Sequence, residues 1–201
     1  MRIYLIRHGE TDWNRERRVM GVDPVPLNER GRRMITHLGE LMMREEFKVI
    51  YSSTVARARE SAEILADIWG AEIIEDDRLN ESRFEKWIGM SFDDLKDDPD
   101  FDKYFLKPTE SRFSTSETIA DIQARALACI EDIVSERRAE KVAVMTHSDI
   151  VKPILAHYCG MDLDLMHRFF VPNASVSMVD LRGRFPRVPF VSCTPWKWLE
   201  R

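Results

Sequence analysis

The sequence predicts an α/β protein whose sheet is mostly parallel and is covered by helices on both faces. Short apolar runs of β type alternate along the chain with longer segments in which apolar residues recur at helical spacing, and this alternation is typical of such sheets. The first run, Ile3 to Ile6, is expected to be a buried strand. At 201 residues, with 44% hydrophobic and 32% charged residues, the chain suits one domain with a sizeable core.

Six apolar runs are the expected strands, and the last of them is expected at an edge of the sheet. They cover residues 3–7, 49–51, 72–75, 142–146, 176–181 and 190–193. Four longer segments show the helical pattern, and they cover residues 29–46, 54–69, 115–138 and 149–158. In the second of these, Ala58, Ala62, Leu65 and Trp69 follow one another at spacings of four, three and four, which places them on one helix face.

Residues 79–113 do not follow this alternation. The segment contains Trp87, Pro99, Pro108 and an acidic cluster over residues 93–102. Because prolines interrupt regular elements, we expect short helices and loops inserted over one edge of the sheet, with the acidic cluster as a solvated surface. The chain, 1–201, is therefore expected to form a single domain with one insertion at about 79–113.

Charge and composition argue against several classes of function. The net charge of -5 argues against nonspecific binding of nucleic acid, which needs a broadly basic surface. No segment approaches the length of a membrane span, and the first apolar run is too short for a signal peptide. Cys129, Cys159 and Cys193 show neither metal-ligand nor disulfide spacing, which predicts a cytoplasmic protein.

Two of the expected strands run directly into a histidine. The first ends on Arg7 and is followed by His8, and the run VAVMT over residues 142–146 leads into His147. Open α/β sheets bind ligands at the carboxyl ends of their strands. If the two strands are parallel neighbours, about 4.8 Å apart, both imidazoles emerge at the same edge, close enough to bind one small group.

A third strand adds a cation at this edge. The run over residues 49–51 ends before Ser52 and Ser53, and Arg57 lies in the first turn of the next helix, where N–H groups and the helix dipole favour anions. Two arginines and two histidines describe a pocket for a dianion such as phosphate, to which arginine donates paired bonds. Each of these four side chains alone could have a purely structural role. Because all four are expected at the same edge of the sheet, an anion-binding pocket is the better interpretation.

Five motifs resemble those of the histidine phosphatase superfamily, the phosphoglycerate-mutase-like family, over nearly the whole chain. In chain order they are RHGETDWN, VDPVPLNERGRRM, YSSTVARARESAEIL, LNESRFEKWIGM and VMTHSDI. The resemblance implies a three-layer α/β/α sandwich on a mostly parallel six-stranded sheet with one antiparallel strand. It also implies a phosphatase, that is, a phosphoric monoester hydrolase, which uses neither a metal nor a cofactor.

The resemblance assigns roles to individual residues. His8 is the nucleophile that becomes phosphohistidine, and Glu81 protonates the leaving oxygen and then activates water. The other expected site residues bind the phosphoryl oxygens or line the substrate site: Arg7, Arg57, His147, Asn14, Gly21 and Ser148. Arginines can supply the electrostatic stabilisation that the equatorial oxygens of a phosphoryl group need in the transition state.

The chain departs from the family's pattern in two places. Ser148 stands where a glycine often follows the second histidine, and its backbone N–H is retained. In ESRFEKWIG, Glu85 and Ile88 replace the usual glycine and glutamate. These departures leave the local backbone and the substrate preference open, but they retain Glu81.

Two other functions stay open at this point. A cofactor-dependent phosphoglycerate mutase would share the phosphohistidine, although mutases of this type usually carry a longer insertion that encloses the substrate. A noncatalytic anion-binding domain would be favoured if one of four residues were missing, and all four are present: His8, Arg57, Glu81 and His147.

The expected partner is a small phosphorylated metabolite. Arg83 and Lys86, beside Glu81, are either readers of a carboxylate, as in phosphoserine or a phosphoglycerate derivative, or surface charges; sugar phosphates and ribazole phosphate are further alternatives.

The C-terminal stretch PWKWLER holds two tryptophans, Trp196 and Trp198. Chain ends are normally polar, so large aromatic side chains there imply that something covers them. Packing along the edge of the sheet is the first expectation. The alternatives are a homodimer contact and a flap over the phosphate pocket, where Lys197 or Arg201 would add positive charge.

Overall fold

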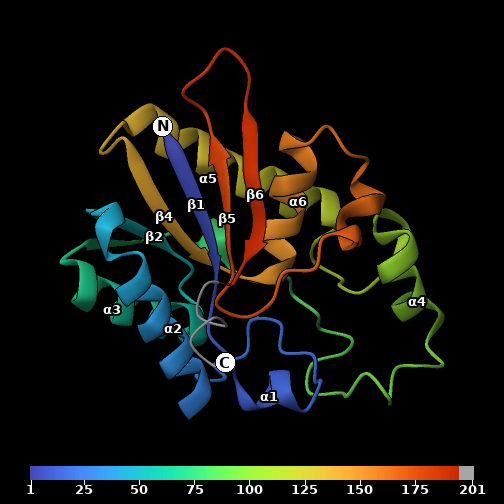
Figure 1. Ribbon diagram of the computed structural model, residues 1–201. Coiled ribbons are helices and arrows are strands. Elements are labelled where there is room, and N and C mark those ends of the chain that lie inside the picture. The colour runs from blue at the N-terminus through green and yellow to red at the C-terminus, as the bar shows by residue number, and fades with distance from the viewer. Residues whose placement is uncertain (195–201) are drawn as a thin grey trace.

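Six strands form one sheet in the order β3-β2-β4-β1-β5-β6 in a computed structural model that describes residues 1–194 (Figure 1). The strands are β1 (Arg2–Arg7), β2 (Val49–Ser52), β3 (Glu72–Glu75), β4 (Lys141–Thr146), β5 (Val176–Asp180) and β6 (Arg187–Cys193). β1 pairs in parallel with β4, and β4 and β3 pair in parallel with β2. β5 runs antiparallel to both β1 and β6. The predicted sheet, mostly parallel with one antiparallel strand, is confirmed.

Helices cover both faces of this sheet. The α-helices are α1 (Asp12–Arg15), α2 (Glu29–Leu41), α3 (Ala56–Trp69), α4 (Pro99–Leu106), α5 (Ile119–Glu136) and α6 (Ser148–Tyr158). Alternate residues of β1 face opposite layers: Tyr4 and Ile6 belong to the core beneath α2 and α3, and Ile3 and Leu5 belong to the core beneath α5 and α6 (Figure 1). The three-layer sandwich is therefore formed by two apolar cores, one on each face.

Helix ends account for most differences from the expected ranges. The helix expected over 29–46 ends at Leu41 and is followed by the 3₁₀-helix η1 (Met43–Glu45). The helix expected over 115–138 begins only at Ile119, because Thr118 and Asp121 form a capping box. It ends at Glu136, since Arg137 takes a left-handed conformation.

The segment 79–113 consists of turns, α4 and the 3₁₀-helix η3 (Pro108–Glu110). Its aromatic side chains extend the core beneath α5 and α6, and Trp87 is only 1% exposed. The acidic cluster is mostly exposed, but Asp98 is not merely solvated: it accepts a hydrogen bond from Trp87 Nε1 at 3.0 Å, pairs with Lys86 and caps α4. A carboxylate of this cluster therefore helps to anchor the segment.

The 3₁₀-helix η4 (Leu163–Arg168) packs against α4 and α6, and η2 (Asp77–Leu79) follows β3. None of the helices within residues 1–194 is long and apolar enough to cross a membrane.

The stretch with Trp196 and Trp198 lies outside the described residues. Edge packing, a homodimer contact and a flap over the pocket therefore all stay predictions for it.

Candidate active site

The carboxyl edge of the sheet brings the two predicted histidines together. Arg7 and Thr146 are register partners on β1 and β4, and the His8 N–H donates to the Thr146 carbonyl at 3.0 Å. The imidazole rings of His8 and His147 lie 5.2 Å apart between centroids. The expected adjacency of the two strands is confirmed, and it positions both rings at one point of the sheet edge.

Hydrogen bonds fix the tautomer of His8. Its Nδ1 lies 2.6 Å from the carbonyl oxygen of Gly9, which can only accept, so Nδ1 carries the proton. Its Nε2 therefore keeps a lone pair, and this nitrogen accepts a hydrogen bond from Arg57 Nε at 3.1 Å. Burial, and then the charges of Arg57 and Arg7, hold the pKa of His8 well below its usual value. The ring is thus neutral and has its nucleophilic nitrogen at Nε2.

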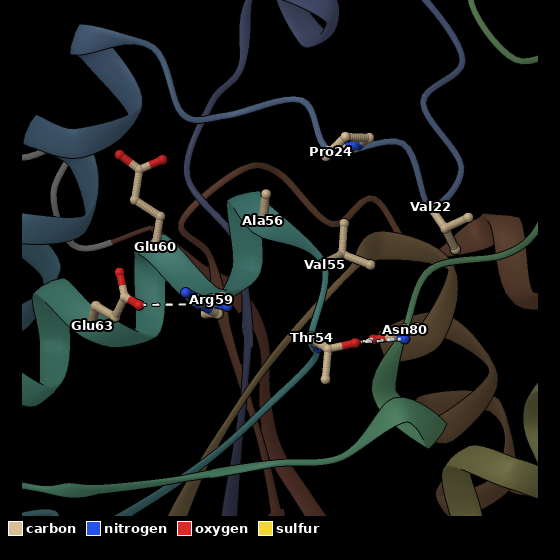
Figure 2. A pocket seen from close by; sticks show the side chains of 9 residues that line it. All are labelled: Val22, Pro24, Thr54, Val55, Ala56, Arg59, Glu60, Glu63 and Asn80. Atoms are coloured by element: carbon tan, nitrogen blue, oxygen red, sulfur yellow. Dashed lines mark hydrogen bonds and ion pairs between the residues drawn. The ribbon is translucent and has the colours of Figure 1, made fainter.

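Arg57 is fully buried on the first turns of α3 and keeps its charge. Its Nη2 and Nη1 donate to the carbonyls of Gly21 and Asp23 at 2.7 and 3.2 Å. Burial lowers the pKa of Arg57 to about 10, so the guanidinium stays cationic at neutral pH. Arg59, two residues later, lines a separate hollow and pairs with Glu63 (Figure 2). Only the first of these two arginines therefore reaches His8.

The loop that follows His8 packs tightly against α2. A Cβ atom on Gly9 would lie 2.6 Å from the carbonyl oxygen of Gly31, and one on Gly31 would overlap the backbone of Glu10. The loop can approach the helix this closely only because both positions lack a side chain. The glycines of two separate motifs thus hold the backbone next to the His8 ring.

His147 is completely buried behind His8. Ser53 Oγ donates to Asn80 Oδ1 and lies 2.8 Å from His147 Nε2, so Nε2 carries the proton of the neutral ring. The other nitrogen, Nδ1, has no hydrogen-bond partner among the described residues and lies 4.0 Å from Glu81 Oε2. In the neutral ring this nitrogen carries a lone pair, so it can donate to an added oxygen ligand only once it is protonated.

Glu81 lies next to this nitrogen and has the pKa of a group that can exchange protons. Its Oε1 accepts a hydrogen bond from the N–H of Ser82 at 2.9 Å. Burial raises the pKa of Glu81 to about 7, the charge of Asp149 adds to the rise, and the charge of Arg57 opposes it. A carboxyl group with a pKa near the working pH is suited to general acid–base catalysis.

Arg7 and Asn14 complete the group. Arg7 Nη1 donates to the Val171 carbonyl at 2.6 Å, and its Nε has no partner within the described part of the chain. Asn14 Oδ1 accepts bonds from Thr11 and Asn173, each at 3.1 Å, which turns its amide nitrogen away from those partners. Both residues line the wall of one cavity.

A cavity of about 670 Å³ opens onto these side chains. The predicted site residues on its wall are Arg7, Asn14, Gly21, Arg57, Glu81 and Ser148. His8 and His147 lie behind that wall and are at most 1% exposed, because Arg57 covers His8. The side chain of Arg83 is exposed and does not line the cavity, and Lys86 is paired with Asp98 and Asp100. The structure does not bring these two cations to the site.

Sequence reasoning missed several residues on the cavity wall. Asn173 Nδ2 donates to the carbonyls of His8 and Gly9, each at 3.2 Å. A second cluster joins Asp149 to Tyr104 Oη at 2.7 Å and to Lys152 Nζ at 2.8 Å. The position of Asn173 could have been predicted from the sequence, because it lies just before the antiparallel strand β5. The start of β5 lies at the same edge of the sheet as the carboxyl ends of the parallel strands.

Comparison with known proteins shows the family of this chain. Residues 3–194 match the model of the histidine phosphatase superfamily (branch 1). A phosphoserine phosphatase 1 of Hydrogenobacter thermophilus is 30% identical over 189 residues, covering 92% of this chain and 88% of the relative. A probable phosphoglycerate mutase GpmB of an Enterobacter species is 26% identical over 182 residues, covering 90% and 85%.

Among solved structures, a phosphoserine phosphatase mutant of Entamoeba histolytica in complex with phosphoserine superposes with a TM-score of 0.87. The match covers 97% of this chain and 98% of that one at 23% sequence identity, so it shows the shared fold. The chain belongs to the histidine phosphatase superfamily. The prediction of a phosphoric monoester hydrolase of this superfamily is thereby confirmed.

Proposed function

We propose that this protein hydrolyses small phosphate monoesters through a phosphohistidine formed on His8. The observation that supports this most directly is the hydrogen bonding of the ring: Nδ1–H is bound by the Gly9 carbonyl, and Nε2 keeps its lone pair beside Arg57. A neutral imidazole held in this tautomer is a prepared nucleophile. The bond from Arg57 to Nε2 is replaced when a phosphoryl group arrives, and the guanidinium then donates to the phosphoryl oxygens.

In the first step, the lone pair of His8 Nε2 forms a bond to phosphorus, and the bond from phosphorus to the ester oxygen breaks. The ester oxygen takes the proton of Glu81, whose pKa of about 7 leaves a large protonated fraction at neutral pH. The guanidinium groups of Arg7 and Arg57 face the charge on the phosphoryl oxygens, and His147 Nδ1 can join them only as a protonated donor. Electrostatic stabilisation of these oxygens lowers the barrier.

In the second step, water attacks phosphorus and the P–N bond breaks, which returns the electron pair to His8 Nε2. Glu81, now a carboxylate, takes the proton that water loses. Through both steps the Nδ1–H of His8 stays bonded to the Gly9 carbonyl, which stabilises the positive charge of the phosphorylated ring. Phosphate then leaves, and Glu81 is again protonated for the next turnover.

Phosphoryl transfer to a second site on the product is the alternative that one relative's name supports, since it is a probable phosphoglycerate mutase. Both activities would share the His8 chemistry. We propose hydrolysis because, of these two relatives, the one with the higher identity is a phosphoserine phosphatase.

The cytosol stays the proposed compartment. Its support is that the three cysteines form no disulfide in the structure.

The test is release of inorganic phosphate from p-nitrophenyl phosphate, phosphoserine and 3-phosphoglycerate by the purified chain, with no metal added. Hydrolysis of at least one substrate is expected. Interconversion of 3- and 2-phosphoglycerate that outpaces phosphate release would favour the mutase. No turnover of any of them, together with saturable binding of phosphate, would leave the noncatalytic anion-binding domain.

A further inference from the structure

The cavity is larger than the phosphate-binding centre. Its volume of about 670 Å³ is typical of pockets that enclose a whole small molecule. Beyond Arg7 and Arg57, its wall is largely aromatic: Trp13, Phe84, Phe92, Phe101, Tyr104 and Phe105. The wall therefore has room for the organic part of a phosphate ester, and charged groups on that wall decide which organic parts are bound.

The cations on the wall differ in whether their charge is already neutralised. Arg18 pairs with Glu16 at 2.8 Å, and Lys152 pairs with Asp149 at 2.8 Å. Arg30 pairs with Glu10 at 2.5 Å. In each of these pairs the carboxylate already satisfies the cation.

Arg17 differs from these three cations. Within residues 1–194, no carboxylate oxygen lies within 4.0 Å of its guanidinium group. The group lies over the ring of Phe92, with 5.5 Å between its central carbon and the ring centroid. The side chain of Arg17 is exposed, whereas Arg57 is buried and Arg7 is half-buried, so Arg17 stands at the solvent end of the cavity.

The backbone also holds Arg17 in place. Its φ of 55° is left-handed, which is uncommon for a residue with a side chain. Two hydrogen bonds fix this conformation: the Arg17 N–H donates to the Asn14 carbonyl at 3.2 Å, and the Arg17 carbonyl accepts from Phe92 N–H at 2.9 Å. The residue is thereby tied to the same segment that provides its aromatic platform, which reduces the ordering needed when it binds a ligand.

We infer that Arg17, on its Phe92 platform, forms a second anion subsite, which binds a carboxylate or second phosphate on the organic part of the substrate. The inference rests on the proposed function and narrows its substrate class to phosphate esters with two anionic groups. In this inference Arg17 takes the role that the sequence suggested for Arg83 or Lys86, the binding of the second anionic group. Arg83 does not line the cavity, and Lys86 is paired with acidic residues. A guanidinium group suits both anions because it donates paired hydrogen bonds to either.

Three probes test the subsite: glycerol 3-phosphate, 3-phosphoglycerate and glycerol 1,3-bisphosphate. The second replaces a neutral group of the first by a carboxylate, and the third adds a phosphate. In Arg17→Asn, asparagine tolerates the left-handed backbone. We expect the ratio of kcat/KM for a two-anion probe over that for glycerol 3-phosphate to fall about tenfold. The probe whose ratio falls identifies the anion as a carboxylate or a phosphate.

Two further variants control this experiment. Arg17→Lys keeps the charge and should recover part of the preference. Arg15→Asn removes an arginine that pairs with Asp12 and does not line the cavity, and should leave the ratio unchanged. Equal losses for all three probes in Arg17→Asn, or ratios that change less than twofold, would overturn the subsite.

Binding separates this inference from the proposed function. In a His8→Ala background, calorimetric titration measures the affinity for the same probes without turnover. A preference for the two-anion probes that disappears with Arg17→Asn would support the subsite even if the wild-type protein hydrolysed nothing. Equal affinities for all probes in both backgrounds would reject it even if the protein proved to be a phosphatase.

Discussion

The side chain of Arg57 donates from Nε to Nε2 of His8 over 3.1 Å, while both residues are shielded from solvent. This bond determines which nitrogen keeps the lone pair and places a cation where phosphoryl oxygens would gather. It also closes the ring off from the cavity. Arg57 therefore orients the nucleophile before substrate binds and becomes a ligand of the phosphoryl group afterwards.

Replacing Arg57 by lysine tests this double role. Lysine keeps a charge but loses the planar fork, so it cannot bind His8 and the carbonyls of Gly21 and Asp23 together. We expect kcat/KM to fall by about 10²- to 10³-fold. Arg59→Lys is the matched control on the same helix, because Arg59 faces the separate hollow of Figure 2. Similar losses in the two variants would contradict the role of Arg57.

His8→Ala removes the ring whose Nε2 accepts the hydrogen bond from Arg57. We expect turnover to fall by at least about a thousandfold, with little change in the melting temperature. After rapid quenching in alkali with ³²P-labelled substrate, the wild-type protein should retain a label that is stable in base and lost in acid, and that the variant lacks. His157→Ala, an exposed histidine of α6, is the control. A label of equal size in His8→Ala would place the phosphoenzyme on another residue.

The sequence predicted the centre of this site because the chemistry follows the strand ends. Arg7, His8 and His147 each stand at the carboxyl end of β1 or β4, and these strands are neighbours. A short apolar run and the residue after it were enough for that prediction. The tautomer of His8 was not predictable, since it depends on a carbonyl one residue away and on an arginine 49 residues away.

The outer parts of the cavity were not predictable in the same way. Arg83 follows the buried Glu81 and Ser82, yet its side chain is exposed, since proximity in sequence does not fix the direction of a side chain. Arg17 has no sequence signal, since its place depends on Phe92 and on a left-handed backbone. Local patterns locate strand ends, whereas side chains from separate loops meet only once the chain has folded.

Glu81→Gln should affect substrates according to their leaving groups. An alkoxide needs a proton as it departs, whereas p-nitrophenolate hardly does, so the amide removes a contribution that only the alkyl ester uses. We expect kcat for an alkyl phosphate to fall by about 10²- to 10⁴-fold and kcat for p-nitrophenyl phosphate to fall far less. Glu63→Gln, on the exposed side of α3, serves as the control. Equal losses for both substrates would show that Glu81 is not the acid.

The dependence of activity on pH tests the protonation state of Glu81. If protonated Glu81 is the acid, kcat/KM for an alkyl phosphate should fall about tenfold per pH unit above the pKa of about 7. This limb should be absent in Glu81→Gln. kcat/KM is the appropriate quantity because it reports the free enzyme.

Asp149→Asn should move this falling limb to lower pH. Burial is the larger cause of the raised pKa of Glu81, and the negative charge of Asp149 adds to it. Removing that charge makes ionisation of Glu81 easier, so its pKa falls and the acid form is lost sooner as pH rises. Lys152, freed of its partner, acts in the same direction. Asp67→Asn, an exposed position of α3, should leave the limb in place. A limb that stays fixed or moves to higher pH in Asp149→Asn would show that Asp149 does not set the proton affinity of Glu81.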